Sequence, residues 1–284
     1  MSIFDAFVRR HDYLVCVDSD GCVMDTMNGK HSRCFGPCMV TEWRLEEWRD
    51  AILERWNIIN LFSMTRGINR FQGLAMALDE IHAQYTPIEG IEALKDWVAN
   101  APALSNDALV KAIFAAQEPS ARRVLEKALS WSKEVNAAIV ALPEETKVPY
   151  EGAKEGLTAA HSFADVAMVS SANREAVEAE WGKFGLLEHT DIILAQDVGS
   201  KAACIAEMLK FGYALDHVLM VGDAPGDCYA AEKNGVFYYP ILVNKEKESW
   251  TELRETGLKK LKEMTYGGAY QEKKKKEFYF NLGG

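Results

Sequence analysis

Short apolar segments that stop at polar or glycine residues recur along the chain, most densely in its second half. Such segments are typical of buried strands in a parallel sheet. Helical patterns separate the later ones, and this alternation predicts a doubly wound α/β sheet. The predicted strands are Tyr13–Val17, Val166–Val169, Ile192–Ala195 and Val218–Val221, with a fifth candidate at Val236–Tyr239, and the helices between them are Glu175–Phe184, Lys201–Phe211 and Asp227–Lys233.

Residues 25–148 show a different pattern, with few strand-like segments and many helical ones. We therefore expect a core domain made of residues 1–24 and 149–284, interrupted by a helical domain at residues 25–148. The charged segment after Lys245 is also expected to be helical. The predicted helices of the inserted domain are Trp43–Trp56, Arg70–His82, Gly90–Val98, Asn106–Ala116 and Ser120–Leu142.

Composition narrows the class of protein. The chain has 42 acidic and 32 basic residues and a net charge of −10, which disfavours general binding to nucleic acid or to anionic membranes. No apolar run is long enough to span a membrane, and the N-terminus is too polar for a secretory signal. The six cysteines are then expected to be free thiols in a cytoplasmic protein. The four lysines Lys273–Lys276 could contact nucleic acid, but the negative net charge of the chain favours a solvated helix end.

Polar residues stand where predicted strands end. Asp18, Ser170 and Asp223 each stand at the carboxyl end of such a strand. Asp20 lies two residues after Asp18, and Asp227 lies four residues after Asp223. In open α/β sheets, ligands bind at the carboxyl ends of the strands. We therefore expect these five residues to converge on one crevice.

The residue types at this crevice fit phosphoryl transfer. Crowded carboxylates repel one another unless a cation is present, and an all-oxygen cluster suits Mg²⁺. Lys201 after the third strand, together with Ser170 and Ser171, would supply positive charge and donors for phosphate oxygens. Asp18 could act as a nucleophile and Asp20 as a general acid and base.

Each of these motifs also has a simpler interpretation. A "DxDG" sequence is common in calcium loops, but an EF-hand is excluded because its fifth, sixth and twelfth positions would be Cys22, Val23 and Gly29. "GDAPGD" could be a turn followed by a helix cap, Ser170 another cap, and Lys201 a surface lysine. Their shared position after predicted strands favours a functional site.

Four segments resemble the motifs of the haloacid dehalogenase superfamily of phosphohydrolases: "LVCVDSDGCVMDT", "AMVSSAN", "GSKAACI" and "VLMVGDAPGDCYAAEKNGV". The resemblance implies that Asp18 is the nucleophile and Asp20 the general acid and base. It also implies that Ser170 binds phosphate and that Lys201 is the lysine of the third motif. The implied magnesium ligands are Asp18, the backbone carbonyl of Asp20, and Asp223, with Asp227 in a supporting or water-bridged role.

The resemblance also narrows the chemistry. True dehalogenases lack the second aspartate, and P-type ATPases need membrane spans, so neither activity is expected here. The helical insertion resembles the cap of phosphoglycolate phosphatases and β-phosphoglucomutases. In it, "SMTRGINRFQG" offers Arg66, Asn69 and Arg70 to an anionic substrate. The expected substrate-binding residues are Ser171, Asn173, Arg66 and Arg70.

The sequence thus predicts a Rossmann-like α/β core with an inserted helical cap. Its predicted activity is magnesium-dependent hydrolysis of a small phosphorylated metabolite through an aspartyl phosphate. A sugar-phosphate mutase would use the same carboxylates and stays open. A phosphonoacetaldehyde hydrolase would need a Schiff-base lysine, for which Lys30 is the cap-side candidate. A non-catalytic protein that binds phosphate with the same fold is the alternative from another class.

Overall fold

The computed structural model describes residues 3–284, which divide into two compact units. The sheet unit comprises the chain up to Met27 together with Glu144–Gly284, and the helical unit comprises Asn28–Pro143. These divisions lie a few residues from the expected ones. Two backbone hydrogen bonds join the segments through which the chain leaves and re-enters the sheet unit. They run from Asp25 N to Val148 O and from Tyr150 N to Val23 O, and both are 2.8 Å long.

Within the described residues the sheet has five strands, all parallel, in the order β3-β2-β1-β4-β5. The central strand β1 pairs through Val17 with Met168 of β2 on one side and Val221 of β4 on the other. The residue that follows β1 therefore lies between the ends of two neighbouring strands. The strands are β1 Tyr13–Val17, β2 Ala164–Val169, β3 Ile192–Leu194, β4 Val218–Gly222 and β5 Phe237–Pro240, so all five predicted strands are confirmed.

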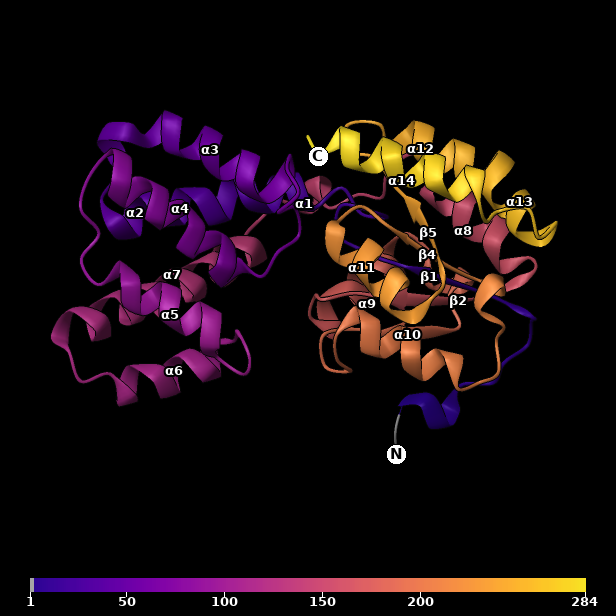
Figure 1. The fold of residues 1–284 in the computed structure, drawn as a ribbon, viewed down its shortest axis with the longest axis horizontal. Helices are drawn as coiled ribbons and strands as arrows, with labels where there is room; N and C mark the ends of the chain where they lie inside the picture. The colour runs from indigo at the N-terminus through magenta and orange to yellow at the C-terminus, as the bar shows by residue number, and fades with distance from the viewer. Residues whose placement is uncertain (1–2) are drawn as a thin grey trace. The chain divides into compact units, whose positions relative to one another are not determined.

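Both faces of the sheet are buried, as expected for continuous apolar strands. On one face, Val15 and Val17 pack with residues of α8, α9, α12 and α13, and on the other, Leu14 and Cys16 pack with residues of α10 and α11. Figure 1 shows the strands at the centre of this unit with helices on both sides. The helices are α8 Ala153–His161, α9 Arg174–Lys183, α10 Lys201–Leu209, α11 Pro225–Asn234, α12 Glu246–Glu252, α13 Leu258–Lys262 and α14 Ala269–Asn281, with short helical turns at Ile3–Ala6, Glu144–Thr146, Leu187–His189, Leu215–His217 and Leu253–Gly257. This confirms the predicted α/β fold class.

The helical unit is built around aromatic side chains. Trp56 and Trp131 are fully buried, and the indole nitrogen of Trp131 donates to the carbonyl of Phe35 at 3.1 Å. The helices here are α1 Met27–Lys30, α2 Gly36–Trp43, α3 Arg49–Leu61, α4 Arg70–Gln84, α5 Ile91–Asn100, α6 Asn106–Ala115 and α7 Pro119–Val140, with a π-helical turn at His31–Phe35 and a 3₁₀ turn at Glu46–Trp48.

The predicted helix Trp43–Trp56 is wrong over its first half. Helix α2 ends at Trp43 because Arg44 adopts a left-handed conformation, with φ 57°, and its amide bonds back to the carbonyls of Val40 and Thr41. Helix α3 starts only at Arg49. Apolar periodicity missed this break because the residue that ends α2 is arginine, whereas glycine usually marks such a turn.

The expected solvated lysine run is also wrong in one respect. The C-terminal segment is helical as predicted, but the side chain of Lys274 is only 3% exposed and lies 2.6 Å from both Glu252 and Glu277. Its ammonium also lies over the ring of Tyr239. This lysine is therefore part of the packing between α14, α12 and β5.

Two further expectations concern the chain as a whole. The six cysteines are free, as predicted. Within residues 3–284, every helix is too short or too polar to span a lipid bilayer.

Candidate active site

Three buried carboxylates meet where β1 and β4 end. Asp18 follows β1 and its amide donates to Val221 O at 3.0 Å, while Asp223 follows β4 and Asp227 lies in the first turn of α11. One carboxylate oxygen from each aspartate lies within 4.8 Å of the others. The structure thus brings Asp18 together with two aspartates that lie more than 200 positions further along the sequence, as parallel strand order predicts.

Lys201 places one ammonium group among these carboxylates. It is the first residue of α10, whose N-terminus is capped by the Ser200 side chain. Its Nζ lies 2.9 Å from Asp18 Oδ1 and 2.6 Å from Asp227 Oδ1. Burial lowers the pKa of Lys201, but the two carboxylates outweigh this effect and raise it above the usual value. The lysine therefore stays charged.

The surroundings of Asp18 disfavour the charged form of its carboxyl group. Burial raises its pKa well above the usual range, Lys201 opposes the shift, and the charges of Asp227 and Asp223 add to it. One ammonium faces three carboxylates, so the cluster has an excess of negative charge. A divalent cation with a preference for oxygen ligands would remove that excess, and this donor set fits Mg²⁺.

Both carboxylate oxygens of Asp227 have partners within the protein. Asp227 uses Oδ1 for Lys201, and its Oδ2 accepts the amides of Asp223 at 3.2 Å and Ala224 at 3.0 Å. These contacts hold the Asp227 carboxylate in place beside Asp18 and Asp223, and the three together could hold a metal ion. Gly222 permits this arrangement, because a Cβ there would lie 2.3 Å from Asp227 Cγ.

Asp20 lies in the tight turn after β1. The Ser19 carbonyl accepts the amides of Cys22, Val23 and Met24, and Gly21 adopts the left-handed conformation, with φ 82°, that this turn requires. Asp20 is only partly buried, and its Oδ1 accepts a hydrogen bond from the Thr26 hydroxyl at 2.5 Å. No sequence motif marks Thr26, because its contact with Asp20 depends on how the turn folds back.

The loop after β2 holds three further candidates. Ser170 is buried, its amide donates to Leu194 O at 2.9 Å, and its hydroxyl accepts the amide of Ala172 at 3.1 Å. Ser171 is exposed, and Asn173 caps α9 by accepting the amide of Ala176. Strand pairing therefore places Ser170 at the same sheet edge as Asp18, one strand away.

The remaining candidates lie in the helical unit and have packing roles there. Arg66 is 1% exposed and donates to Leu61 O at 2.8 Å. Asn69 caps α4, and Arg70 donates to Asn136 Oδ1 at 2.7 Å, while burial lowers the pKa of its guanidinium. These contacts within the helical unit account for the positions of Arg66, Asn69 and Arg70. The assignment of Arg66 and Arg70 to substrate binding therefore stays a prediction.

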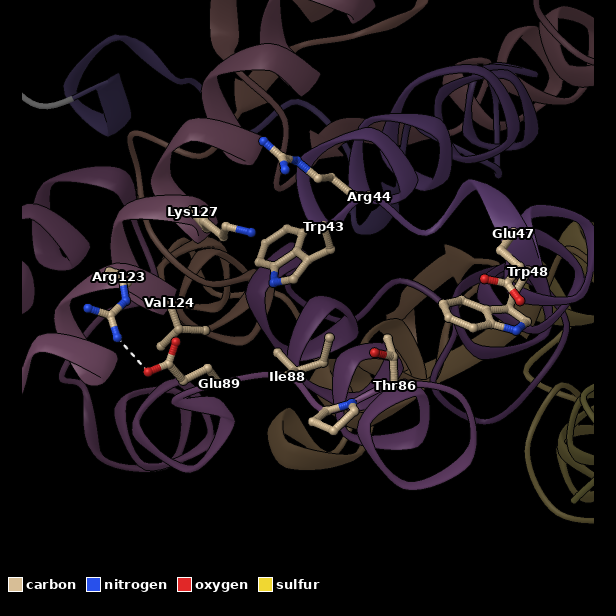
Figure 2. Close-up of a pocket in the computed structure, with 11 residues that line it drawn as sticks. Trp43, Arg44, Glu47, Trp48, Thr86, Ile88, Glu89, Arg123, Val124 and Lys127 are labelled. Carbon is tan, nitrogen blue, oxygen red and sulfur yellow. Dashed lines mark hydrogen bonds and ion pairs between the residues drawn. The ribbon is translucent and has the colours of Figure 1, made fainter.

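The helical unit also contains a cavity of about 340 Å³, shown in Figure 2. Its charged groups are largely engaged: Arg123 pairs with Glu89 at 2.5 Å, and Lys127 lies over the ring of Trp43. The predicted site residues are absent from its wall, so this cavity does not belong to the carboxylate cluster. The lining residues are Trp43, Arg44, Glu47, Trp48, Thr86, Pro87, Ile88, Glu89, Arg123, Val124 and Lys127.

Comparison with known proteins supports both the fold and the motifs. The family model described as haloacid dehalogenase-like hydrolase matches residues 98–240, half of the chain. This segment includes Ser170, Lys201, Asp223 and Asp227 but begins after the turn that carries Asp18. No curated protein matches the sequence.

Several solved structures are similar at low sequence identity. A candidate phosphoglycolate phosphatase from Lactobacillus delbrueckii subsp. bulgaricus is 14% identical, with 81% of this chain and 86% of that chain covered and a TM-score of 0.50. A candidate haloacid dehalogenase-like hydrolase from Bacteroides fragilis is 13% identical, with 84% and 92% covered and a TM-score of 0.44. A candidate β-phosphoglucomutase from Thermotoga maritima is 14% identical, with 80% and 84% covered and a TM-score of 0.41. The first of these likenesses supports the shared fold.

Proposed function

Because the chain belongs to the haloacid dehalogenase-like hydrolase family, as its motifs predicted, we propose that it is a magnesium-dependent phosphatase acting on a small phosphomonoester. The observation that carries the proposal is the environment of Asp18. Its carboxylate lies at the end of the central strand, 2.9 Å from the Lys201 ammonium and within reach of two further carboxylates. This combination of a nucleophile, a fixed cation and a site for a metal ion suits phosphoryl transfer.

In the first half-reaction, Asp18 attacks the phosphorus atom of the ester and forms an aspartyl phosphate. The bond between phosphorus and the ester oxygen breaks, and Asp20 donates a proton to the departing alkoxide. Lys201 and the Ser170 loop offer donors to the phosphoryl oxygens. Asp20 suits proton transfer because it is partly exposed, while the Thr26 hydroxyl fixes the orientation of its carboxyl group.

In the second half-reaction, water attacks the phosphorus atom while Asp20 takes up its proton. The bond between phosphorus and the Asp18 oxygen breaks, which releases phosphate and restores the carboxylate. A magnesium ion held by Asp18, Asp223 and the Asp20 carbonyl, with Asp227 in support, would supply positive charge to Asp18 and to the phosphoryl oxygens.

We assign the helical unit the role of a cap that selects the substrate. It is inserted between Met27 and Glu144, directly after the turn that carries Asp18 and Asp20. An insertion at this point can bring side chains to a substrate bound at the sheet edge and exclude water from it. The expected partner is a small phosphorylated metabolite.

The test is phosphate release from an aryl phosphate, measured with magnesium and with chelator, for the native protein and for Asp18→Asn. We expect turnover only with magnesium and only in the native protein. Asp12→Asn is the matched control, because it removes one exposed carboxylate just before β1. Activity that persists in Asp18→Asn would contradict the mechanism.

Two further measurements distinguish a phosphatase from a mutase and from a non-catalytic protein. A sugar phosphate that yields an isomer with no inorganic phosphate would identify a mutase. Magnesium binding without turnover on any phosphomonoester would favour a non-catalytic role.

A further inference from the structure

Two buried tryptophans hold the turn that carries the proposed nucleophile. The indole nitrogen of Trp181, in α9, donates to the hydroxyl of Ser19 at 2.8 Å, and that of Trp250, in α12, donates to the carbonyl of Cys22 at 2.9 Å. Trp181 is 0% exposed and Trp250 is 1% exposed. The two bonds reach the turn from different helices and act at different residues of it.

Ser19 is the central residue of this turn. Its carbonyl accepts the three amides that close the turn, and its hydroxyl accepts the bond from Trp181. Because Ser19 stands between Asp18 and Asp20, a rotation of its backbone would move both carboxylates. A hydrogen bond buried away from water is costly to leave unmade, so the bond to Trp181 restrains that rotation.

Helix α9 connects this turn to the rest of the proposed site. Helix α9 starts at Arg174, directly after the Ser170 loop. The guanidinium of Arg174 pairs with Asp197 at 2.8 Å and donates to the carbonyl of Ile193 at 3.2 Å. The start of α9 is thus fixed against β3 and the loop that leads to Lys201. Trp181 lies two turns further along the same helix, so one rigid element spans all three loops.

Trp250 is held just as firmly on its own side. Its ring packs against Gly156 of α8, where a Cβ would lie 2.5 Å from the ring, and its Cβ lies close to Gly152, the residue before α8, where a Cβ would lie 3.2 Å away. Close backbone approach therefore fixes the ring and aims its nitrogen at Cys22.

We propose that Trp181 and Trp250 are positioning residues for Asp18 and Asp20, which is a role beyond core packing. The inference rests on the proposed function. By holding the turn at Ser19 and Cys22, the two indoles keep the Asp20 carboxyl group in line with the leaving oxygen while Asp18 attacks. A small displacement of the turn weakens proton transfer before it affects the fold.

The kinetic test uses Trp181→Phe and Trp250→Phe, which remove the donor and keep most of the apolar ring. It compares kcat/KM for an alkyl phosphate and an aryl phosphate. An alkoxide leaves only with a proton from Asp20, whereas an aryloxide leaves more readily without one. We therefore expect the alkyl-to-aryl ratio to fall about tenfold in each variant, a fraction of the usual contribution of general acid catalysis.

Tyr266→Phe is the matched control, because it removes a buried side-chain donor from the sheet unit and leaves both bonds to the turn intact. The bond that it removes runs from the Tyr266 hydroxyl to the carbonyl of Tyr238 and is 2.8 Å long. The ratio in this control should equal that of the native protein. An unchanged ratio in either test variant would remove that tryptophan from the proposal. An equal fall in the control would overturn the proposal altogether.

A second measurement does not depend on turnover. Hydrogen exchange of the Cys22, Val23 and Met24 amides should accelerate in Trp181→Phe and in Ser19→Ala, which removes the acceptor and keeps the tryptophan. Protection equal to that in the Tyr266→Phe control would contradict the positioning role. If the native protein hydrolyses neither phosphate, the proposed function fails, and the exchange result still decides whether the tryptophans order the turn.

Discussion

Replacing the proposed nucleophile should make the metal-free protein more stable. In Asp18→Asn, one of three clustered carboxylates becomes neutral while its shape is kept. The carboxylate oxygens lie within 4.8 Å of one another, which at an effective dielectric constant of about 20 corresponds to at least about 3.5 kcal/mol of repulsion per pair. Asp18 takes part in two such pairs.

The attraction that opposes this repulsion is of similar size. Lys201 Nζ lies 2.9 Å from Asp18, which gives about 6 kcal/mol on the same scale. Repulsion and attraction nearly cancel, and the desolvation of a buried carboxylate then adds a cost of several kcal/mol. Since asparagine can still accept a hydrogen bond from Lys201, we expect Asp18→Asn to be more stable by about 2 kcal/mol without metal.

The sign of the pH dependence follows from the raised pKa of Asp18. Burial, opposed by Lys201 and reinforced by Asp227 and Asp223, lifts it well above 3.8. The folded state therefore holds this proton more tightly than the unfolded state, so the native protein loses stability as the pH rises above the usual aspartate range. Asp18→Asn has no carboxyl group at this position and does not lose stability in this way. The two proteins should be alike near pH 4 and differ most near pH 8.

The assay is thermal unfolding in chelator and in magnesium at both pH values, with the exposed Asp12→Asn variant as control. About 2 kcal/mol corresponds to about 4–8 °C for a unit of this size. Magnesium should raise the midpoint of the native protein more than that of Asp18→Asn. A lower midpoint for Asp18→Asn in chelator near pH 8, or a difference that does not change with pH, would refute this reasoning.

Three further predictions concern the same unit. Gly222→Ala should displace Asp227, because its new Cβ would lie 2.3 Å from Asp227 Cγ, and isothermal titration should then show weakened magnesium binding. Lys201→Met should lower kcat about 100-fold or more by removing the fixed charge at the phosphoryl oxygens, whereas retained turnover would exclude Lys201 from the reaction. Lys274→Met should lower the free energy of unfolding by about 1 kcal/mol or more, because it removes the buried ammonium that joins Glu252 and Glu277. Lys273→Met, at an exposed lysine, should change this free energy by less than about 0.5 kcal/mol. Equal effects in urea unfolding would contradict a packing role for Lys274.

The sheet and its polar edge were predictable because both depend on local patterns. Each strand is a short apolar segment, and Asp18 and Asp223 follow two of them directly. Once the strands are parallel, their ends must meet at one edge, so the meeting of the carboxylates needs no further information.

The parts that could not be predicted depend on tertiary contacts. Nothing in the helical pattern around Arg44 shows that this residue turns left-handed and ends α2. The sequence around Lys274 is typical of a solvated helix, yet Glu252 and Glu277 pair with it in the folded chain. The bond between Trp181 and Ser19 joins residues 162 positions apart, and only the packing of α9 on the sheet brings them together.

The central claim is that Asp18 carries the phosphoryl group. It is tested most directly by mixing the protein with a phosphomonoester and magnesium, quenching rapidly in acid, and measuring the mass of the peptide that contains Asp18. We predict a transient gain of one phosphoryl group in the native protein, located at Asp18 by fragmentation, and none in Asp18→Asn. Turnover without a labelled peptide, or a label on another residue, would contradict the account.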